Sequence, residues 1–104
     1  MFLNLNEGFF GGAICTRRTT VRFGTNKECN NAYGHTDSFI DTILINNELQ
    51  HMKKFTTISL LHEMSHLALY QGPYIGYEGY GGHHTRFYAL IDRLYQAGAY
   101  EGLL

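Results

Sequence analysis

The pattern of hydrophobic and polar side chains changes from strand-like stretches before residue 50 to helical periodicity after residue 55. Residues 13–23 alternate in part between apolar and polar side chains. Residues 30–35 form a short polar segment, and residues 39–46 are apolar on both faces. These patterns are typical of β-strands, and a strand that is apolar on both faces is expected in the middle of a sheet. Because turn-forming residues join the strands over short distances, we predict a three-stranded antiparallel sheet.

Three further stretches predict helices. Residues 2–10 favour a short amphipathic helix that ends at a glycine pair. Residues 55–70 predict a second helix, with Thr56 or Thr57 as its N-cap, and residues 85–97 carry one apolar stripe at helical spacing. The segment between these two helices is rich in glycine and tyrosine, which indicates a long irregular loop. The whole chain of 104 residues is therefore predicted to be one α+β domain.

The charge balance argues against a nucleic-acid-binding protein. Lys and Arg total 8 and Asp and Glu total 9, so we expect weak or no binding of nucleic acid by the chain itself. Arg17, Arg18 and Arg22 form a small basic patch, which is best interpreted as a solvated strand face. Cys15 and Cys29 lack CxxC spacing and are expected to be free thiols in a reducing cytoplasm.

The chain shows no sign of membrane association. No stretch approaches the length of a transmembrane helix, and the first residues lack the basic start and long apolar run of a signal peptide. We therefore expect a cytoplasmic protein without a membrane partner, and we favour a monomer.

The strongest chemical signal is the H-E-x-x-H motif formed by His62, Glu63 and His66. On a helix the two histidines lie one turn apart on the same face, so that both imidazoles can reach one metal ion. Glu63 leans toward the same cleft, where it can hold and deprotonate a water at the metal. The flanking residues are strongly apolar, so the helix is expected to be largely buried, and buried histidine and glutamate side chains need partners.

A catalytic zinc usually has three protein ligands and water in the fourth position, so one ligand remains to be found. Glu78, His83 and His84 are the candidates, and the two histidines lie where the loop enters the last helix, which can fold back onto the motif helix. Only one of the two adjacent histidines is expected to point at the metal. His35 and His51 have no partner at ligand spacing and are expected to be ordinary polar residues.

Four segments resemble the SprT-like zinc metallopeptidases, the group that includes bacterial SprT and the Spartan proteases. Residues 60–66 (LLHEMSH) look like the L-L-H-E-M-x-H helix of that family, and residues 82–90 (GHHTRFYAL) resemble its G-H-G-x-x-F-x-x-L segment. Residues 9–12 (FFGG) are similar to its aromatic-F-G-G before the first strand, and residues 43–49 (ILINNEL) to its I-x-L-N-x-x-L strand end. The segments occur in the order of the family and span most of the chain.

The resemblance implies a minimal zincin-like metallopeptidase domain that holds one Zn²⁺ per chain. The positions that match the motifs of the family imply that His62, His66 and His83 bind zinc and that Glu63 is the general base. His84 replaces the second glycine of G-H-G and is the alternative third ligand. The C-terminal zinc ribbon and the DNA- or partner-binding extensions of larger members have no counterpart in this sequence, and such a reduced domain would suit a phage or mobile-element protein.

Two further groups of residues are candidates for contact with substrate. Tyr74, Tyr77, Tyr80 or Arg86 could donate a hydrogen bond to the oxyanion of the tetrahedral intermediate. A peptide is expected to add as a strand to an exposed sheet edge, where backbone hydrogen bonds give affinity without demanding a sequence. The short polar strand is the better edge candidate. The predicted substrate edge consists of Asn31, Ala32, Tyr33, Gly34 and His35.

The function expected from these features is zinc-dependent cleavage of peptide bonds in an extended polypeptide. One alternative is a zinc-bound binding module that sequesters a protein partner with little or no proteolysis, although such a module has no need of Glu63. The other alternative is a metal-dependent hydrolase acting on a non-peptide bond, which the H-E-x-x-H motif makes a weaker hypothesis.

Overall fold

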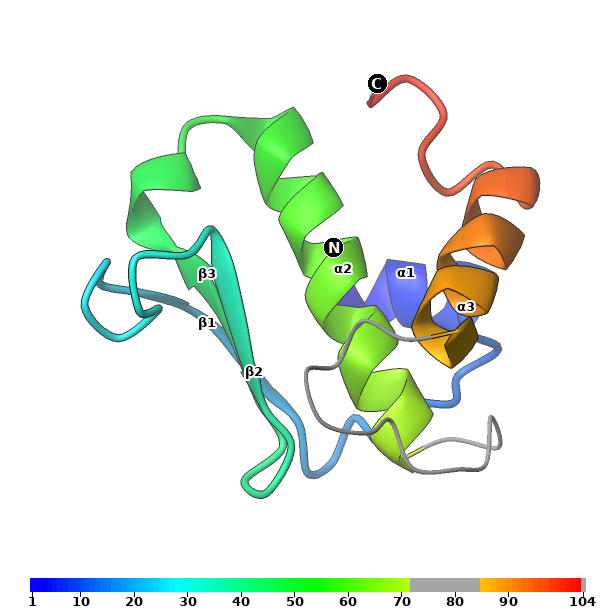
Figure 1. Ribbon diagram of the computed structural model, residues 1–104, viewed down its shortest axis with the longest axis horizontal. Coiled ribbons are helices and arrows are strands. Elements are labelled where there is room, and N and C mark those ends of the chain that lie inside the picture. Colours follow the sequence, from blue (N-terminus) through cyan, green and yellow to red (C-terminus); the bar gives the residue numbers. More distant parts are fainter. Residues whose placement is uncertain (72–84, 104) are drawn as a thin grey trace.

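The computed structural model describes residues 1–71 and 85–103, which form an α+β fold. The described residues contain three α-helices, one 3-10 helix and a three-stranded mixed sheet (Figure 1). The elements are, in chain order, α1 (Phe2–Phe9), β1 (Thr20–Gly24), β2 (Gly34–Asp37), β3 (Thr42–Asn46), η1 (Asn47–Leu49), α2 (Lys53–Gln71) and α3 (Thr85–Gln96).

The sheet has the strand order β1-β3-β2, and it corrects the prediction of a purely antiparallel sheet. β2 runs antiparallel to β3, with Gly34 opposite Ile45, whereas β1 runs parallel to β3, with Thr20 opposite Thr42. The prediction that the third strand is central is confirmed, because both other strands pair with β3. β3 takes this place because its side chains are buried on both faces, while β1 and β2 are more polar and more exposed.

The connection from β1 to β2 explains the parallel pairing. It does not form a tight hairpin but passes over the end of β3, where the Asn46 side-chain amide donates to Asn26 Oδ1 at 2.8 Å and to the Ala32 carbonyl at 3.0 Å. Asn30 and Asn31 turn this loop with left-handed φ angles of 54° and 62°, a conformation that asparagine tolerates better than most residues. The loop therefore delivers β2 to the far side of β3.

All three strands are shorter than predicted. The stretch before Thr20 is a turn, in which the Thr19 hydroxyl donates to the Cys15 carbonyl at 2.6 Å. Residues 30–33 belong to the loop, so that β2 starts at Gly34 and extends to Asp37. Phe39 and Ile40, predicted to be in the apolar strand, lie in the β2–β3 turn and are 91% and 64% exposed.

Helix α2 is the centre of the molecule. It lies between the sheet on one side and α1 and α3 on the other (Figure 1), and it packs against β2, β3 and α3. Leu61, Met64 and Leu67 are completely buried, which confirms the prediction of a largely buried helix. The predicted N-caps are wrong, because α2 already begins at Lys53 and the Thr56 hydroxyl donates to the Leu49 carbonyl at 2.6 Å inside the first turn.

Helix α3 confirms the predicted apolar stripe over most of its length. Phe87, Leu90 and Leu94 are buried against the core, and Ile91 is half-buried. Tyr95, the last member of the stripe, is 59% exposed and lies on the border of the packed face. Within the described residues, no helix is long and apolar enough to cross a membrane.

Candidate metal centre

His62 and His66 project from the same face of α2 and bring their ring nitrogens together. Their Nε2 atoms are 3.3 Å apart, and their ring centroids are 5.0 Å apart. Two nitrogens that are each 2.0–2.1 Å from a tetrahedral zinc ion lie about 3.3 Å apart, so this spacing fits two ligands of one ion. Without a metal, the same spacing allows one Nε2–H to donate to the other ring nitrogen.

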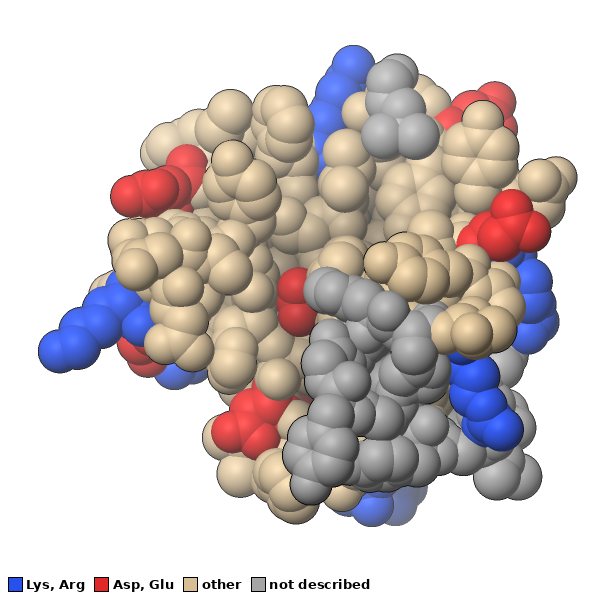
Figure 2. All heavy atoms as spheres, in the orientation of Figure 1, with Lys and Arg blue, Asp and Glu red and all other residues tan. Residues whose placement is uncertain are grey.

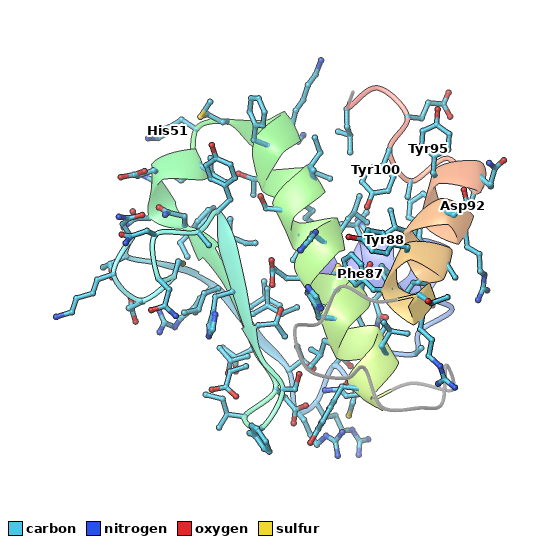
Figure 3. The ribbon with its side chains drawn as sticks, in the orientation of Figure 1. His51, Phe87, Tyr88, Asp92, Tyr95 and Tyr100 are labelled. Carbon is cyan, nitrogen blue, oxygen red and sulfur yellow. The ribbon has the colours of Figure 1, made fainter. Side chains whose placement is uncertain are left out.

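Phe87 of α3 fixes the orientation of both imidazoles. Its ring stacks on His66 with a centroid distance of 4.5 Å and meets His62 edge-on at 5.0 Å. Figure 3 shows Phe87 pointing from α3 toward α2. Because Phe87 is buried, the two histidine rings have an apolar wall on one side and can turn their nitrogens toward each other.

Glu63 lies beside the histidine pair and is held by strand β2. Its side chain is only 9% exposed, and Oε2 lies 4.0 Å from His62 Nε2. The Thr36 hydroxyl donates to Glu63 Oε1 at 2.7 Å and also approaches the main-chain carbonyl of Glu63 at 3.2 Å. The carboxylate therefore has one oxygen anchored on the sheet and the other facing the imidazoles, within the distance that a single water can bridge.

Gly34 gives Glu63 the space that it occupies. A Cβ atom at position 34 would lie 2.9 Å from both Cγ and Oε2 of Glu63 and 3.1 Å from Cδ. Any side chain would force the carboxylate or β2 to move. The absence of a side chain at position 34 therefore lets β2 approach the Glu63 side chain closely.

Only two of the five residues of the predicted substrate edge lie in a strand. Gly34 and His35 lie in β2, which pairs with β3 at one edge of the sheet, but the other predicted members, Asn31, Ala32 and Tyr33, lie in the preceding loop. The strand does not extend back to Asn31 because Asn31 has a left-handed φ, although the Tyr33 carbonyl still accepts a hydrogen bond from the main-chain N–H of Asn46 at 2.9 Å.

Thr36 contacts Glu63 in the candidate site and was not predicted from the sequence. Gly34 and Thr36 are two positions apart on β2 and therefore share the face of the sheet that meets Glu63. Nothing in the sequence showed that this face would meet Glu63.

Several predicted site residues lie outside the described residues, namely Tyr74, Tyr77, Glu78, Tyr80, His83 and His84. Within residues 1–71 and 85–103, no group of three His, Cys, Asp or Glu side chains could hold a metal ion. Arg86 is exposed in the first turn of α3. His51 is exposed in the short segment between η1 and α2 (Figure 3).

The two cysteines are free, and burial makes Cys29 a poor metal ligand. Burial raises the pKa of the Cys29 thiol, and the nearby carboxylates of Glu28 and Glu63 raise that pKa further. The thiol consequently stays protonated near neutral pH, whereas metals bind the thiolate.

The small basic patch is partly neutralised by ion pairs. Arg22 contacts the Glu28 carboxylate at 2.8 Å, and the hydrogen bond from Arg22 lowers the pKa of Glu28 to about 2. Arg18 lies 3.8 Å from Asp41. Figure 2 shows Lys and Arg side chains scattered among Asp and Glu on the face that it displays.

Comparisons of the chain with models of protein families, with curated proteins and with solved structures gave no match.

Proposed function

We propose that this protein is a zinc-dependent endopeptidase with a zincin-like, SprT-like catalytic domain. The observation that supports this most strongly is the arrangement of three side chains on α2. The Nε2 atoms of His62 and His66 are separated by the distance expected of two zinc ligands, and a buried carboxylate lies 4.0 Å from one of them.

The residues present fit a zinc ion with one further ligand. His62 and His66 would supply two neutral imidazole nitrogens, and His83 or His84 would supply the third. α3 begins at Thr85, and Phe87 two residues later contacts both imidazoles. The residues just before Thr85 are therefore connected to the site by a short length of chain, which supports a ligand from that segment.

In the proposed mechanism, Glu63 moves the proton. Bound zinc would supply Lewis acidity for the scissile carbonyl and the attacking water. Glu63 would take a proton from that water and pass it to the leaving amine. Thr36 would keep Oε1 of Glu63 in place, so that Oε2 faces the reacting atoms. The polypeptide would lie extended along β2, which in the described structure pairs on one side only, with β3.

Zinc content is the direct test of the ligand set. We expect one zinc per chain by elemental analysis, with substantial loss in both His62→Ala and His66→Ala, because each substitution leaves the ion with fewer than three protein ligands. Loss in His83→Ala, with retention in His84→Ala, would identify His83 as the third ligand, and the reverse would identify His84. His51→Ala is the matched control and should keep its zinc. Full zinc in both His62→Ala and His66→Ala would contradict the assignment.

Binding of nucleic acid by the isolated chain should be weak and without sequence preference. The net charge is −1, and two of the three arginines of the basic patch lie next to carboxylates. A fluorescence anisotropy titration with labelled DNA at physiological salt measures this affinity. Tight binding under these conditions would show that another surface of the protein recognises DNA.

A further inference from the structure

An apolar groove adjoins the histidine pair between α2, α3 and the segment after α3. It has a volume of about 400 Å³, which is within the range of binding sites for small ligands. His62 forms part of its wall. The other described residues that line it are aromatic or aliphatic, namely Ile58, Phe87, Tyr88, Ile91, Tyr95 and Tyr100.

Helical spacing builds this groove. Ile58 and His62 are four residues apart on α2, while Tyr88, Ile91 and Tyr95 follow one another at steps of three and four on α3. Tyr88 and Tyr95 are 62% and 59% exposed. Figure 3 shows Tyr88 and Tyr95 on α3, with Tyr100 beside them in the segment that follows the helix. Exposed aromatic rings that cluster on a surface are typical of a site that binds a ligand or another protein.

The chemistry of the lining selects the ligand. None of the described residues that line the groove is a Lys, Arg, Asp or Glu, so a charged side chain would lose water there without gaining an ionic partner. The polar side-chain groups that these described residues contribute are the His62 imidazole and three tyrosine hydroxyls. Burial raises the pKa of Tyr100, which keeps its hydroxyl neutral over the physiological pH range. Such a groove favours a large, uncharged, apolar side chain.

We propose that the groove binds the apolar side chain of the substrate residue next to the bond that is cleaved. This inference rests on the proposed function, since His62 is both a wall of the groove and a proposed zinc ligand. A carbonyl that reacts beside His62 and His66 belongs to a peptide whose consecutive Cα atoms are about 3.8 Å apart. The side chain of a residue at the scissile bond is thus within reach of the groove, and the protein would prefer phenylalanine, leucine, isoleucine or methionine there.

Binding can be tested without any cleavage. The zinc-loaded protein with labelled isoleucine methyl groups is titrated with N-acetylphenylalanine amide or N-acetylglutamate amide at millimolar concentration and followed by NMR. Ile58 and Ile91 line the groove, whereas Ile43 and Ile45 are buried in the sheet and serve as internal references. We expect the phenylalanine probe to shift the methyl signals of Ile58 and Ile91 only, and the glutamate probe to shift neither.

Cleavage specificity provides the second measurement. Sites cut in an unfolded polypeptide are mapped by mass spectrometry for wild type, Tyr88→Ala and Phe39→Ala. Wild type should prefer a large apolar residue at the scissile bond over alanine by about 10-fold or more, since single methylene groups in apolar pockets already give about 10–200-fold discrimination. Tyr88→Ala should lose most of this preference. Phe39→Ala removes an aromatic ring that is 91% exposed in the β2–β3 turn and should keep the preference.

The two measurements separate the groove from the chemistry. Methyl shifts without cleavage of any polypeptide would support the groove and overturn the proposed hydrolysis. Cleavage without a side-chain preference, unmoved Ile58 and Ile91 signals, or equal shifts with both probes would overturn the groove. Shifts of the same signals with protein concentration alone would show that a second copy of the chain covers the groove, which would also overturn the proposal.

Discussion

Glu63→Gln is expected to reduce kcat/KM for peptide hydrolysis by about 10²–10⁴-fold, the range in which general acid–base groups contribute. The substitution keeps the size of the side chain, and the Thr36 hydroxyl can still donate to the amide oxygen, so the buried position should remain occupied as in wild type. The amide cannot accept the proton of the attacking water. Fold and zinc content should therefore remain, while hydrolysis is lost.

The measurement pairs steady-state hydrolysis of an unfolded polypeptide with elemental analysis of the same samples. Glu48→Gln is the matched control, because it makes the same chemical change at an exposed position in η1 and should leave the rate unchanged. Cleavage by Glu63→Gln at the wild-type rate would remove Glu63 from the mechanism. If wild type itself cuts none of a broad panel of polypeptides, the alternative of a zinc-bound binding module is favoured.

The helical part of the site was predictable because it depends on short-range geometry. Residues four apart on a helix must share a face, so the sequence alone brought His62 and His66 together, and the structure places their Nε2 atoms 3.3 Å apart. The apolar character of β3 similarly predicted its central place, since few positions other than the middle of a sheet bury both faces of a strand.

The sheet was less predictable because its pairing depends on contacts between distant residues. The parallel pairing of β1 with β3 follows from a loop that the Asn46 side chain holds over the end of β3, and no local pattern reveals such hydrogen bonds. The third strand was predicted to begin too early, at residue 39. Phe39 and Ile40 are apolar but lie exposed in a turn, and the hydrophobic pattern cannot distinguish such a turn from a strand. The contact of Thr36 with Glu63 joins residues 27 positions apart and was missed for the same reason.

Gly34→Ala is expected to lower kcat by about 10²-fold while the protein stays folded and keeps its zinc. The added Cβ would lie 2.9 Å from Cγ and Oε2 of Glu63, which is closer than the two side chains can tolerate. Glu63 is buried and anchored by Thr36, so either the carboxylate or β2 must move, and a displacement of about 1 Å at a reacting group can cost about 10²-fold in rate. Gly8→Ala in α1 is the matched control, because its Cβ would meet nothing within 4 Å.

A double-mutant cycle then distinguishes how Gly34 acts. If Gly34 serves only to leave space for the Glu63 carboxylate, Gly34→Ala should cost little further activity in the Glu63→Gln background, because two changes that act through one group are not additive. The residual rates of wild type, both single variants and the double variant give the coupling between positions 34 and 63. Full additivity would contradict the steric account and would indicate that Gly34 acts separately, through the pairing of substrate along the edge of β2.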